Sequence, residues 1–282
     1  MNITKIGIVG AGVIGAGIAE TAACRGLGVI LIETAKSQLE KGVEYIRRGL
    51  KKGIERKEVP EKDEDLIIGR IQLALDIQVL SKIDFVIEAV SEEEKTKTEL
   101  ISKLHTICPA QALFASTTSS LSITKLARAS KRAPQVIGMH FMNPVPVMKL
   151  VEIVRGVQTA PETIQAAKNL ASLLGKETVL AHDFPGFMVN RVIAPMINEA
   201  ICALYEGIGS AQDIDRALKL GANHPMGPLQ LADLIGLDLV LHSLQALQKE
   251  FGNPKFAPCP LLVKYVEAGF LGRKTGKGFY EY

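Results

Sequence analysis

A glycine-rich turn directly after a short apolar run constrains this chain more than any other feature. The run covers residues 5 to 9, and Gly10, Gly12 and Gly15 follow it. The first glycine permits a tight turn, the second lets the backbone approach a pyrophosphate, and the third lets a helix lie close to the strand. The pattern predicts a strand, a turn and a helix whose N-terminus binds a dinucleotide. The predicted binding residues in this loop are Gly10, Gly12, Val13, Ile14 and Gly15.

A carboxylate follows the second apolar run at the spacing that such a dinucleotide site requires. Residues 29 to 32 are apolar and mostly β-branched, and Glu33 comes next. An acidic residue about 20 positions beyond the glycine loop accepts hydrogen bonds from the adenosine ribose, and it repels a 2′-phosphate. Glu33 therefore favours NAD over NADP as the cofactor. The alternative is a solvent-facing glutamate at the end of a strand.

Length and composition favour a protein of about two domains with sizeable cores. The chain has 282 residues, of which 47% are hydrophobic, and its net charge of +3 gives no indication of nucleic-acid binding. The four cysteines are far apart and form no C-x-x-C, which argues against a disulfide framework and a cysteine metal site. No apolar run reaches the roughly 18 residues of a membrane span, and no signal peptide precedes the first strand. We therefore expect a soluble, cytoplasmic protein with no metal site.

Short apolar runs alternate with helical patterns over the first two thirds of the chain. This alternation predicts an α/β fold, a Rossmann-type dinucleotide-binding domain over residues 1–184. It breaks at residues 183–187, and the remainder, 185–282, is predicted to be an all-helical domain. Ser122 and Ser210 are expected to cap helices, and Pro228 suits a first helical turn. The predicted strands are 71–76, 84–90, 113–117, 135–141, 149–154 and 178–182, and the main predicted helices are 37–53, 161–175, 188–206 and 237–250.

The segment that follows the predicted strand 84–90 is expected to lie near the cofactor. Ligands of open α/β sheets bind at the carboxyl ends of the strands, and residues Ala89 to Lys97 begin at such an end. The acidic residues Glu92 to Glu94 also suit the first turn of a helix, where negative charge opposes the helix dipole. Both interpretations are compatible.

A histidine and a glutamate on neighbouring predicted strands indicate proton transfer. His140 lies near the end of one strand, and its ordinary pKa of about 6.5 suits it to accept and donate a proton near neutrality. Glu152 interrupts an apolar run, and a buried carboxylate is costly unless it is paired. We expect Nδ1–H of His140 to donate to Glu152, so that Nε2 serves as the base. The alternatives are a structural histidine and a glutamate at a strand edge.

Two further patterns concern ligands and assembly. The predicted helix 37–53 ends in a cluster of basic residues that includes Lys52 and Arg56, which fall on one helical face. The cluster is a solvated surface unless the ligand is polyanionic. The long apolar helix at 188–206 offers more surface than a domain of about 100 residues buries alone. We therefore expect a homodimer.

Several motifs together resemble the 3-hydroxyacyl-CoA dehydrogenase family along the whole chain. The most specific block runs from Gly138 to Glu152 and contains H-F-x-N-P-V-P-x-M-K-L-V-E. The resemblance implies an NAD-dependent enzyme that interconverts a short-chain 3-hydroxyacyl-CoA, such as (S)-3-hydroxybutyryl-CoA, and the 3-oxoacyl-CoA. The other matching motifs are the glycine loop, Glu33, Ser119-Ser120-Leu121, Pro185-Gly186-Phe187-Met188-Val189-Asn190-Arg191 and Gly276-Lys277-Gly278-Phe279-Tyr280.

The resemblance also implies roles for individual residues. His140 is the implied general base in oxidation and acid in reduction, and Glu152 orients it. Ser119 and Asn190 hold the C3 oxygen and thioester region of the substrate. Basic residues matching Lys52 and Arg56 hold the coenzyme A nucleotide. The implied cofactor contacts outside the glycine loop are Glu33, Ala89, Glu92, Lys97, Ser119 and Asn143.

The sequence departs from the family pattern at one position, and it leaves two alternative functions. Thr117 stands where the family motif S-N-T-S-S usually has Asn. A hydroxyl thus replaces an amide that can donate and accept, and the change affects either the affinity for the cofactor or the orientation of its nicotinamide ring. One alternative is a dehydrogenase of a free hydroxy acid or sugar acid. The other is a cofactor-binding protein without catalytic activity, and the set of His140, Glu152, Ser119 and Asn190 argues against it.

Overall fold

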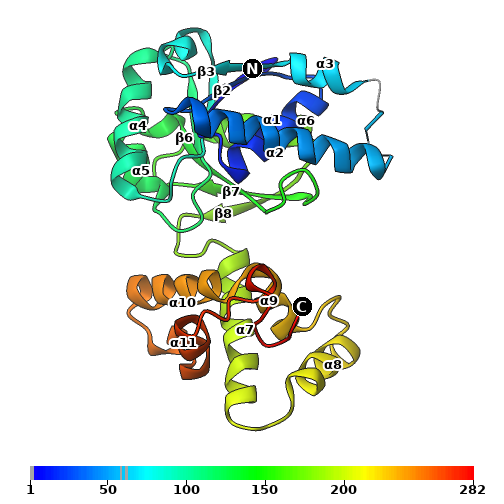
Figure 1. Cartoon of the computed structure of the whole chain (residues 1–282). Coiled ribbons are helices and arrows are strands. Elements are labelled where there is room, and N and C mark those ends of the chain that lie inside the picture. The colour runs from blue at the N-terminus through cyan, green and yellow to red at the C-terminus, as the bar shows by residue number, and fades with distance from the viewer. Residues whose placement is uncertain (1–2, 58, 61–62) are drawn as a thin grey trace. The chain divides into compact units, whose positions relative to one another are not determined.

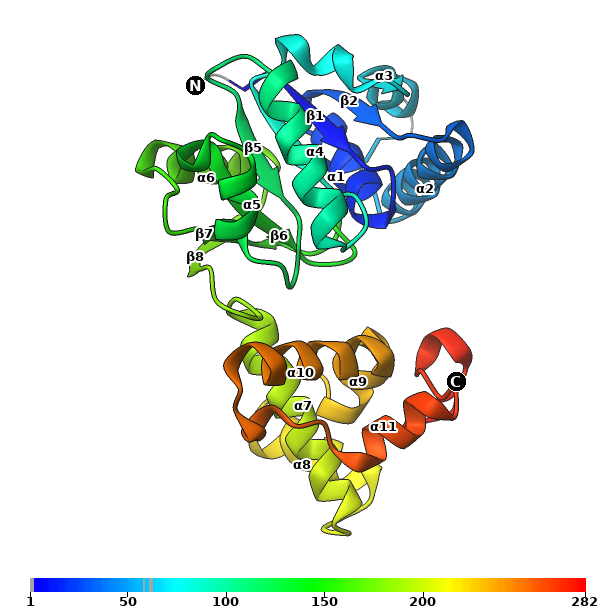
Figure 2. The ribbon, with the colours of Figure 1, turned by 90° about the vertical axis from the view of Figure 1, so that its left-hand side faces the viewer.

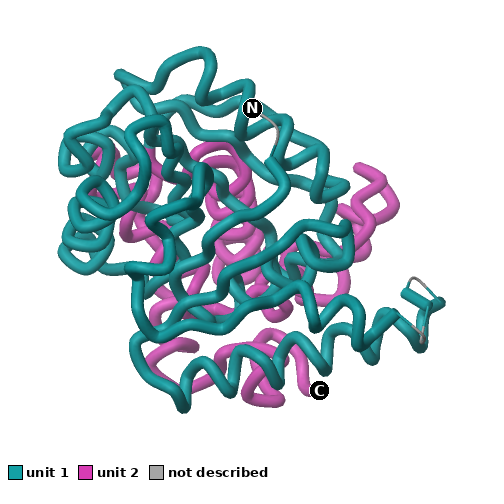
Figure 3. The backbone as a smooth tube through the Cα atoms, turned by 90° about the horizontal axis from the view of Figure 1, so that it is seen from above, with its two compact units in different colours: residues 1–184 teal, residues 185–282 magenta. Residues whose placement is uncertain are grey.

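The computed structural model describes residues 3–57, 59–60 and 63–282. The chain divides into two compact units, Met1–Phe184 and Pro185–Tyr282, which Figure 3 shows in different colours. Each unit has its own hydrophobic core, so each is described by itself.

The first unit is built on one sheet, which has eight strands among the described residues and the order β3-β2-β1-β4-β5-β6-β7-β8. Neighbouring strands are parallel, except that β6 and β7 are antiparallel. This order, with helices between the strands, is the Rossmann-type α/β fold that the sequence predicts. The strands are β1 (Lys5–Val9), β2 (Gly28–Ile32), β3 (Ile71–Ala74), β4 (Phe85–Glu88), β5 (Leu113–Ser116), β6 (Val136–Phe141), β7 (Leu150–Arg155) and β8 (Glu177–His182).

Helices cover both faces of this sheet (Figures 1 and 2). Helices α1 (Val13–Cys24), α2 (Lys36–Glu55) and α6 (Pro161–Leu173) share a core with alternate strand residues such as Ile6 and Ile8. The opposite face carries α4 (Glu94–Ile107) and α5 (Ile123–Ala129). Ile87, Ala115 and Met139 belong to the same core. Because side chains alternate along a strand, the residues that follow them, Glu88, Ser116 and His140, point to the α4 and α5 side. A short helix, α3 (Glu64–Gly69), precedes β3.

Most predicted elements of the first unit are present, with three differences. Ser122 caps α5 as expected, its Oγ accepting from the backbone N–H of Lys125 at 3.2 Å. The apolar runs at 71–76 and 84–90 both predict strands that are buried on both faces of a parallel sheet, which is confirmed for β4 and wrong for β3. β3 lies at the edge of the sheet, so its side chains are only partly covered. The antiparallel direction of β7 and the short helix α3 were not predicted.

The second unit consists of helices packed around α7 (Val189–Tyr205), as the sequence predicts. The C-terminal segment folds back onto this unit because the buried Asp233 accepts hydrogen bonds from the backbone N–H groups of Phe279 and Tyr280. The predicted cap at Ser210, whose Oγ accepts from the backbone N–H of Asp213 at 3.1 Å, and the first-turn position of Pro228 are both confirmed. No described helix is long and apolar enough to span a membrane. The other helices are α8 (Ala211–Gly221), α9 (Pro228–Ile235), α10 (Leu237–Phe251) and α11 (Pro260–Glu267), the last of which was not predicted.

A carboxyl group is buried where α1 packs against α2. Glu20 of α1 is only 4% exposed and lies against Gly49 of α2, where any Cβ atom would overlap the carboxyl oxygens. Burial raises the pKa of Glu20 from its ordinary 4.5 to about 7, and the charge of Arg56 offsets part of this rise. The glycine in α2 therefore makes room for a carboxyl group that the interior does not favour in its charged form.

This burial predicts a pH-dependent gain in stability for Glu20→Gln. Because the folded-state pKa is raised, charging the carboxylate costs stability progressively as pH rises from about 4.5 to about 7. The glutamine variant carries no such cost, so we expect it to be more stable than the parent by about 1 to 3 kcal/mol at pH 8. At pH 4.5 and below the gain should vanish. Urea unfolding at the two pH values measures this difference, and an equal gain at both would contradict the assignment to charge.

Candidate active site

The glycine loop forms a cradle at the carboxyl ends of β1 and β4. Gly10 has a φ of +109°, and a Cβ atom there would overlap the carbonyl of Ala89. A Cβ atom at Gly15 would overlap the carbonyl of Gly10, whereas none of the described atoms lies within 4 Å of the corresponding position at Gly12. The loop is thus closed toward the protein and open at Gly12, as the approach of a pyrophosphate requires.

The start of α1 supplies the donors for this cradle. The backbone N–H of Ala16 makes the first bond of the helix, to the carbonyl of Gly12 at 2.8 Å. The amides of Val13, Ile14 and Gly15 precede that bond, so they belong to the helix positions that lack an intrahelical acceptor. Together with the positive end of the helix dipole, they fit the pyrophosphate of NAD.

Glu33 lies one residue beyond β2 and beside the glycine loop. Its Oε2 accepts from the backbone N–H of Ala11 at 3.1 Å, and its Oε1 accepts from the N–H of Thr34 at 2.8 Å. These bonds hold the half-buried carboxylate at the rim of the cradle. This position agrees with the predicted role at the adenosine ribose, which stays a prediction.

We expect Glu33→Gln to relax the preference for NADH. Removing the negative charge removes the repulsion of a 2′-phosphate, so the ratio of kcat/KM for NADPH to that for NADH should rise on the order of tenfold, or about 1.4 kcal/mol. The exposed Glu40 of α2 offers a matched control, and Glu40→Gln should leave the ratio unchanged. An unchanged ratio in the Glu33 variant would contradict the role of Glu33 in excluding a 2′-phosphate.

A buried ion pair lies at the carboxyl end of β4. Lys97 of α4 donates from Nζ to Glu88 Oε1 at 2.6 Å, and both side chains are 1% exposed. Glu88 Oε2 accepts from Ser116 Oγ at 2.5 Å, which links β4 to β5. Nζ of Lys97 is also 3.4 Å from Oε2 of Glu92. Lys97 therefore holds two carboxylates, one fully inside the protein and one at its surface.

Glu92 organises the loop that carries Ser119. Its Oε1 accepts from Thr118 Oγ1 at 2.6 Å, from the N–H of Ser119 at 2.8 Å and from the N–H of Ser120 at 3.1 Å. Burial alone would raise the pKa of Glu92, but the Thr118 hydroxyl, the Lys97 charge and the other loop donors outweigh it and lower the pKa. Glu92 is thus held as a carboxylate, and the structure brings it together with Ser119 and Lys97.

His140 and Glu152 face each other across the antiparallel pair β6 and β7. Nδ1 of His140 is 2.6 Å from Oε2 of Glu152, and the two residues are 7% and 0% exposed. With Glu152 ionised, Nδ1–H donates to it, and a proton that the ring accepts is taken up at Nε2. The expected contact is present, while the catalytic role of the pair stays a prediction.

Three members of the polar cluster around Lys97 and Glu92 were not predicted from the sequence, namely Glu88, Ser116 and Thr118. Glu88 ends the apolar run of β4 much as Glu152 interrupts that of β7, so the same argument about buried carboxylates could have identified it. Ser116 and Thr118 carry no comparable pattern. At Thr117, the backbone N–H donates to the carbonyl of Glu88 at 3.0 Å, and the hydroxyl has no hydrogen-bond partner among the described residues.

The remaining predicted residues lie apart from this cluster or in the second unit. Arg56 directly follows α2 and lines a cavity beside it, whereas Lys52 is exposed and is not among the described lining residues. Asn143 is exposed in the segment after β6. Asn190 is the second residue of α7 and is half-buried. No group of described His, Cys, Asp or Glu side chains is arranged to hold a metal ion.

Comparison with known proteins decides the family. The family model of the 3-hydroxyacyl-CoA dehydrogenase NAD binding domain matches residues 5–184, and that of the 3-hydroxyacyl-CoA dehydrogenase C-terminal domain matches residues 186–282. The chain belongs to the 3-hydroxyacyl-CoA dehydrogenase family. The glycine loop and Glu33 lie in the matched NAD binding domain, so NAD is the cofactor that this cradle serves.

Individual members of the 3-hydroxyacyl-CoA dehydrogenase family match along nearly their full length. A 3-hydroxybutyryl-CoA dehydrogenase of Bradyrhizobium diazoefficiens is 48% identical over 280 residues, covering 99% of this chain and 96% of the relative. The mitochondrial hydroxyacyl-coenzyme A dehydrogenase of Sus scrofa is 38% identical, covering 99% and 91%. The crystal structure of (S)-3-hydroxybutyryl-CoA dehydrogenase from Ralstonia eutropha has a TM-score of 0.95 at 44% identity, covering 100% of this chain and 99% of that one.

Proposed function

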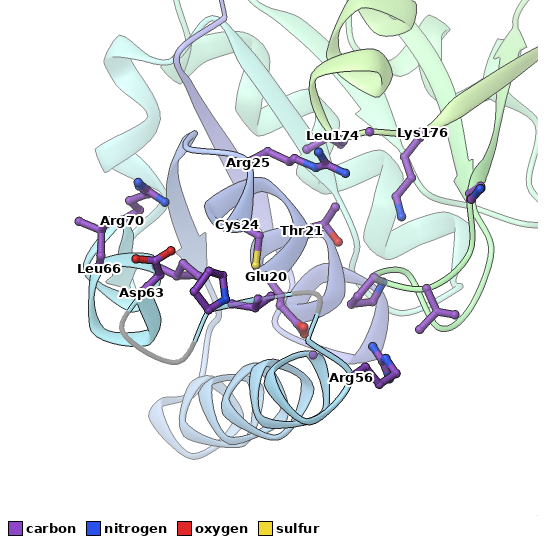
Figure 4. A pocket seen from close by; sticks show the side chains of 18 residues that line it. Glu20, Thr21, Cys24, Arg25, Arg56, Asp63, Leu66, Arg70, Leu174 and Lys176 are labelled. Carbon is purple, nitrogen blue, oxygen red and sulfur yellow. The ribbon is translucent and has the colours of Figure 1, made fainter.

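We propose that this chain is an NAD-dependent oxidoreductase that interconverts (S)-3-hydroxybutyryl-CoA and acetoacetyl-CoA. The observation that carries the proposal is the buried pair of His140 and Glu152 at the carboxyl edge of the sheet that also carries the NAD cradle. A coenzyme A thioester carries a phosphorylated nucleotide that basic side chains can bind, whereas a free hydroxy acid does not. Arg56 lines a cavity beside α1, shown in Figure 4, and it therefore favours the thioester as substrate. A protein without catalytic activity has no need of a paired buried carboxylate.

The chain's own residues have separate tasks in this reaction. Nε2 of His140 takes the proton of the C3 hydroxyl in oxidation and returns it in reduction, while Glu152 fixes the ring and stabilises its charged form. Ser119 and Asn190 position the C3 oxygen and thioester region, and Glu92 and Lys97 position the nicotinamide half of the cofactor. Bound NAD supplies the hydride chemistry.

The first experiment is NADH consumption by the purified protein with acetoacetyl-CoA. Parallel reactions use free acetoacetate with NADH, and acetoacetyl-CoA with NADPH. The proposal expects turnover with the thioester and NADH, and little with either of the other pairs. Equal rates with free acetoacetate would assign the chain to a hydroxy-acid dehydrogenase instead, and no turnover with any pair would favour a cofactor-binding protein without catalytic activity.

We further propose that the protein acts as a cytoplasmic homodimer. The second unit exposes several large apolar side chains, among them Ile208 and Leu220, each 74% exposed. Exposed apolar surface of this kind is typical of association between copies. Light scattering coupled to size-exclusion chromatography should give about twice the 30.4 kDa mass of the chain, whereas the mass of one chain at micromolar concentration would contradict the dimer.

A further inference from the structure

The loop that carries Ser119 joins β5 to α5 and covers residues 117–122. It leaves β5 at Ser116, which pairs with Gly138 of the neighbouring strand β6, and His140 lies two residues further along that strand. The loop therefore starts beside the strand that carries the proposed base. A serine hydroxyl that holds the C3 oxygen must keep its position relative to that base, so the anchors of this loop affect the reaction.

Asp183 anchors the far end of this loop and the first turn of α5. Its Oδ2 accepts from Ser122 Oγ at 2.8 Å and from the backbone N–H of Thr124 at 2.7 Å. Its Oδ1 accepts from the N–H of Ile123 at 2.9 Å. The carboxylate is half-buried and comes from 59 to 61 positions further along the chain than these donors. The two amides lie at the start of a helix, where no intrahelical acceptor exists, so Asp183 satisfies them.

Asp183 is itself held by the sheet. It directly follows β8, and its backbone N–H donates to the carbonyl of Arg155, the last residue of β7, at 3.1 Å. Glu152 lies three residues earlier in β7. A second contact reaches the turn after β7, because Oγ1 of Thr124 accepts from the N–H of Val157 at 3.1 Å. Asp183 therefore connects the loop to the strand that carries the partner of the proposed base.

Two carboxylates thus hold the loop from opposite ends. Glu92 bonds to Thr118, Ser119 and Ser120 in its first half, whereas Asp183 bonds to the last loop residue and to the start of α5. Ser119 lies between the two anchors. With only one anchor in place, the loop could turn about it, so the position of the Ser119 hydroxyl depends on both.

We infer that Asp183 is a positioning residue for the proposed reaction, whose carboxylate keeps the Ser119 hydroxyl in place for the C3 oxygen of the substrate. The inference rests on the proposed function, because Asp183 acts on the reaction through Ser119. It also explains why a carboxylate stands where the α/β alternation ends. The first unit ends one residue later, at Phe184, so the residue that closes the sheet also anchors the substrate loop.

A double-mutant cycle with Ser119 tests the inference. Asp183→Asn keeps the shape of the side chain but replaces one acceptor oxygen by an N–H₂ group, which cannot accept from these donors. We expect kcat/KM for acetoacetyl-CoA to fall about tenfold, while NADH affinity, measured by fluorescence, stays close to that of the parent. In the Ser119→Ala background the same change should cost less than about twofold, because the residue through which it acts is already absent.

The inference is overturned if the double variant loses the product of the two single losses, since a general loss of stability would act independently of Ser119. It is also overturned if Asp183→Asn is as active as the parent. Glu177→Gln is the matched control, because Glu177 is an exposed carboxylate at the start of β8, and its kcat/KM should equal that of the parent.

A milder variant replaces Asp183→Asn if that protein does not fold. Ser122→Ala removes one of the three donors and keeps the carboxylate. We expect kcat/KM to fall about two- to fivefold, and this loss should also disappear in the Ser119→Ala background.

Amide hydrogen exchange separates this inference from the proposed function. Exchange is measured by mass spectrometry on the full-length parent and Asp183→Asn proteins. The segment 117–124 should exchange about tenfold faster in the variant, whereas β1 and α1 should be unchanged. Equal exchange of this segment in the two proteins would overturn the inference. If the parent reduces no acetoacetyl-CoA, the proposed function is refuted, and the exchange result alone decides whether Asp183 holds the loop.

Discussion

Glu152→Gln is expected to lower kcat by about 10²- to 10⁴-fold while the protein still folds and binds NADH. Glu152 accepts from Nδ1 of His140 at 2.6 Å and is fully buried. A glutamine at this position can present its amide N–H₂ to Nδ1, which would favour the tautomer that carries its proton on Nε2. The imidazole would then be unable to accept the proton of the substrate hydroxyl, and its charged form would lose its counter-ion.

Two controls distinguish a catalytic role from a structural one. His140→Ala should cost at least as much in kcat, and the double variant should lose little more than the more damaging single variant, because the two residues act as one unit. The exposed Glu99 of α4 provides a matched carboxylate, and Glu99→Gln should retain full activity. NADH affinity, measured by fluorescence, should be close to that of the parent in all variants. A kcat within a few-fold of the parent for Glu152→Gln would mean that the pair is only structural.

Lys97→Met is expected to destabilise the protein by about 3 to 5 kcal/mol, the cost of leaving a buried charge without its partner. Glu88 is 1% exposed, and its Oε1 forms an ion pair with Nζ of Lys97 at 2.6 Å. The substitution keeps most of the side-chain volume, so the effect reports on charge more than on packing. The same change removes the cation near Glu92, so NADH affinity should also fall.

A second substitution tests whether charge is the cause of this loss. Adding Glu88→Gln to Lys97→Met removes the unpaired carboxylate and should recover a large part of the lost stability. Lys103→Met on the exposed side of α4 serves as the control and should change stability by less than about 0.5 kcal/mol. Urea unfolding of the four proteins supplies the comparison. A double variant no more stable than Lys97→Met would show that Lys97 contributes through packing.

The NAD cradle could be predicted from sequence because it depends on residues that are close along the chain. Gly10, Gly12 and Gly15 are required by local backbone geometry, and the structure confirms the turn that they predict. The contact between His140 and Glu152 was also predictable, although twelve positions separate them. A buried carboxylate needs a partner, and a histidine on the neighbouring strand was the simplest choice.

Other parts of the site depend on which strands and helices become neighbours, and no local pattern encodes that choice. Ser116 reaches Glu88 only because β5 lies beside β4, in the register that places these two residues opposite each other. The cavity beside α1 likewise combines Glu20, Arg25, Lys149 and Lys176 from segments more than 100 residues apart.

The sequence by itself therefore determined the class of fold, the position of the cofactor loop and the family, because each depends on periodicity, glycine geometry or motifs read along the chain. Only the tertiary structure decided the partners of the buried charges and the shape of the cavity. The physical reason is that the free energy of a buried charge depends on the groups within a few ångströms of it. Glu20 and Glu88 show this, since both are buried carboxyl groups: Nζ of Lys97 lies 2.6 Å from Glu88, whereas burial raises the pKa of Glu20 to about 7.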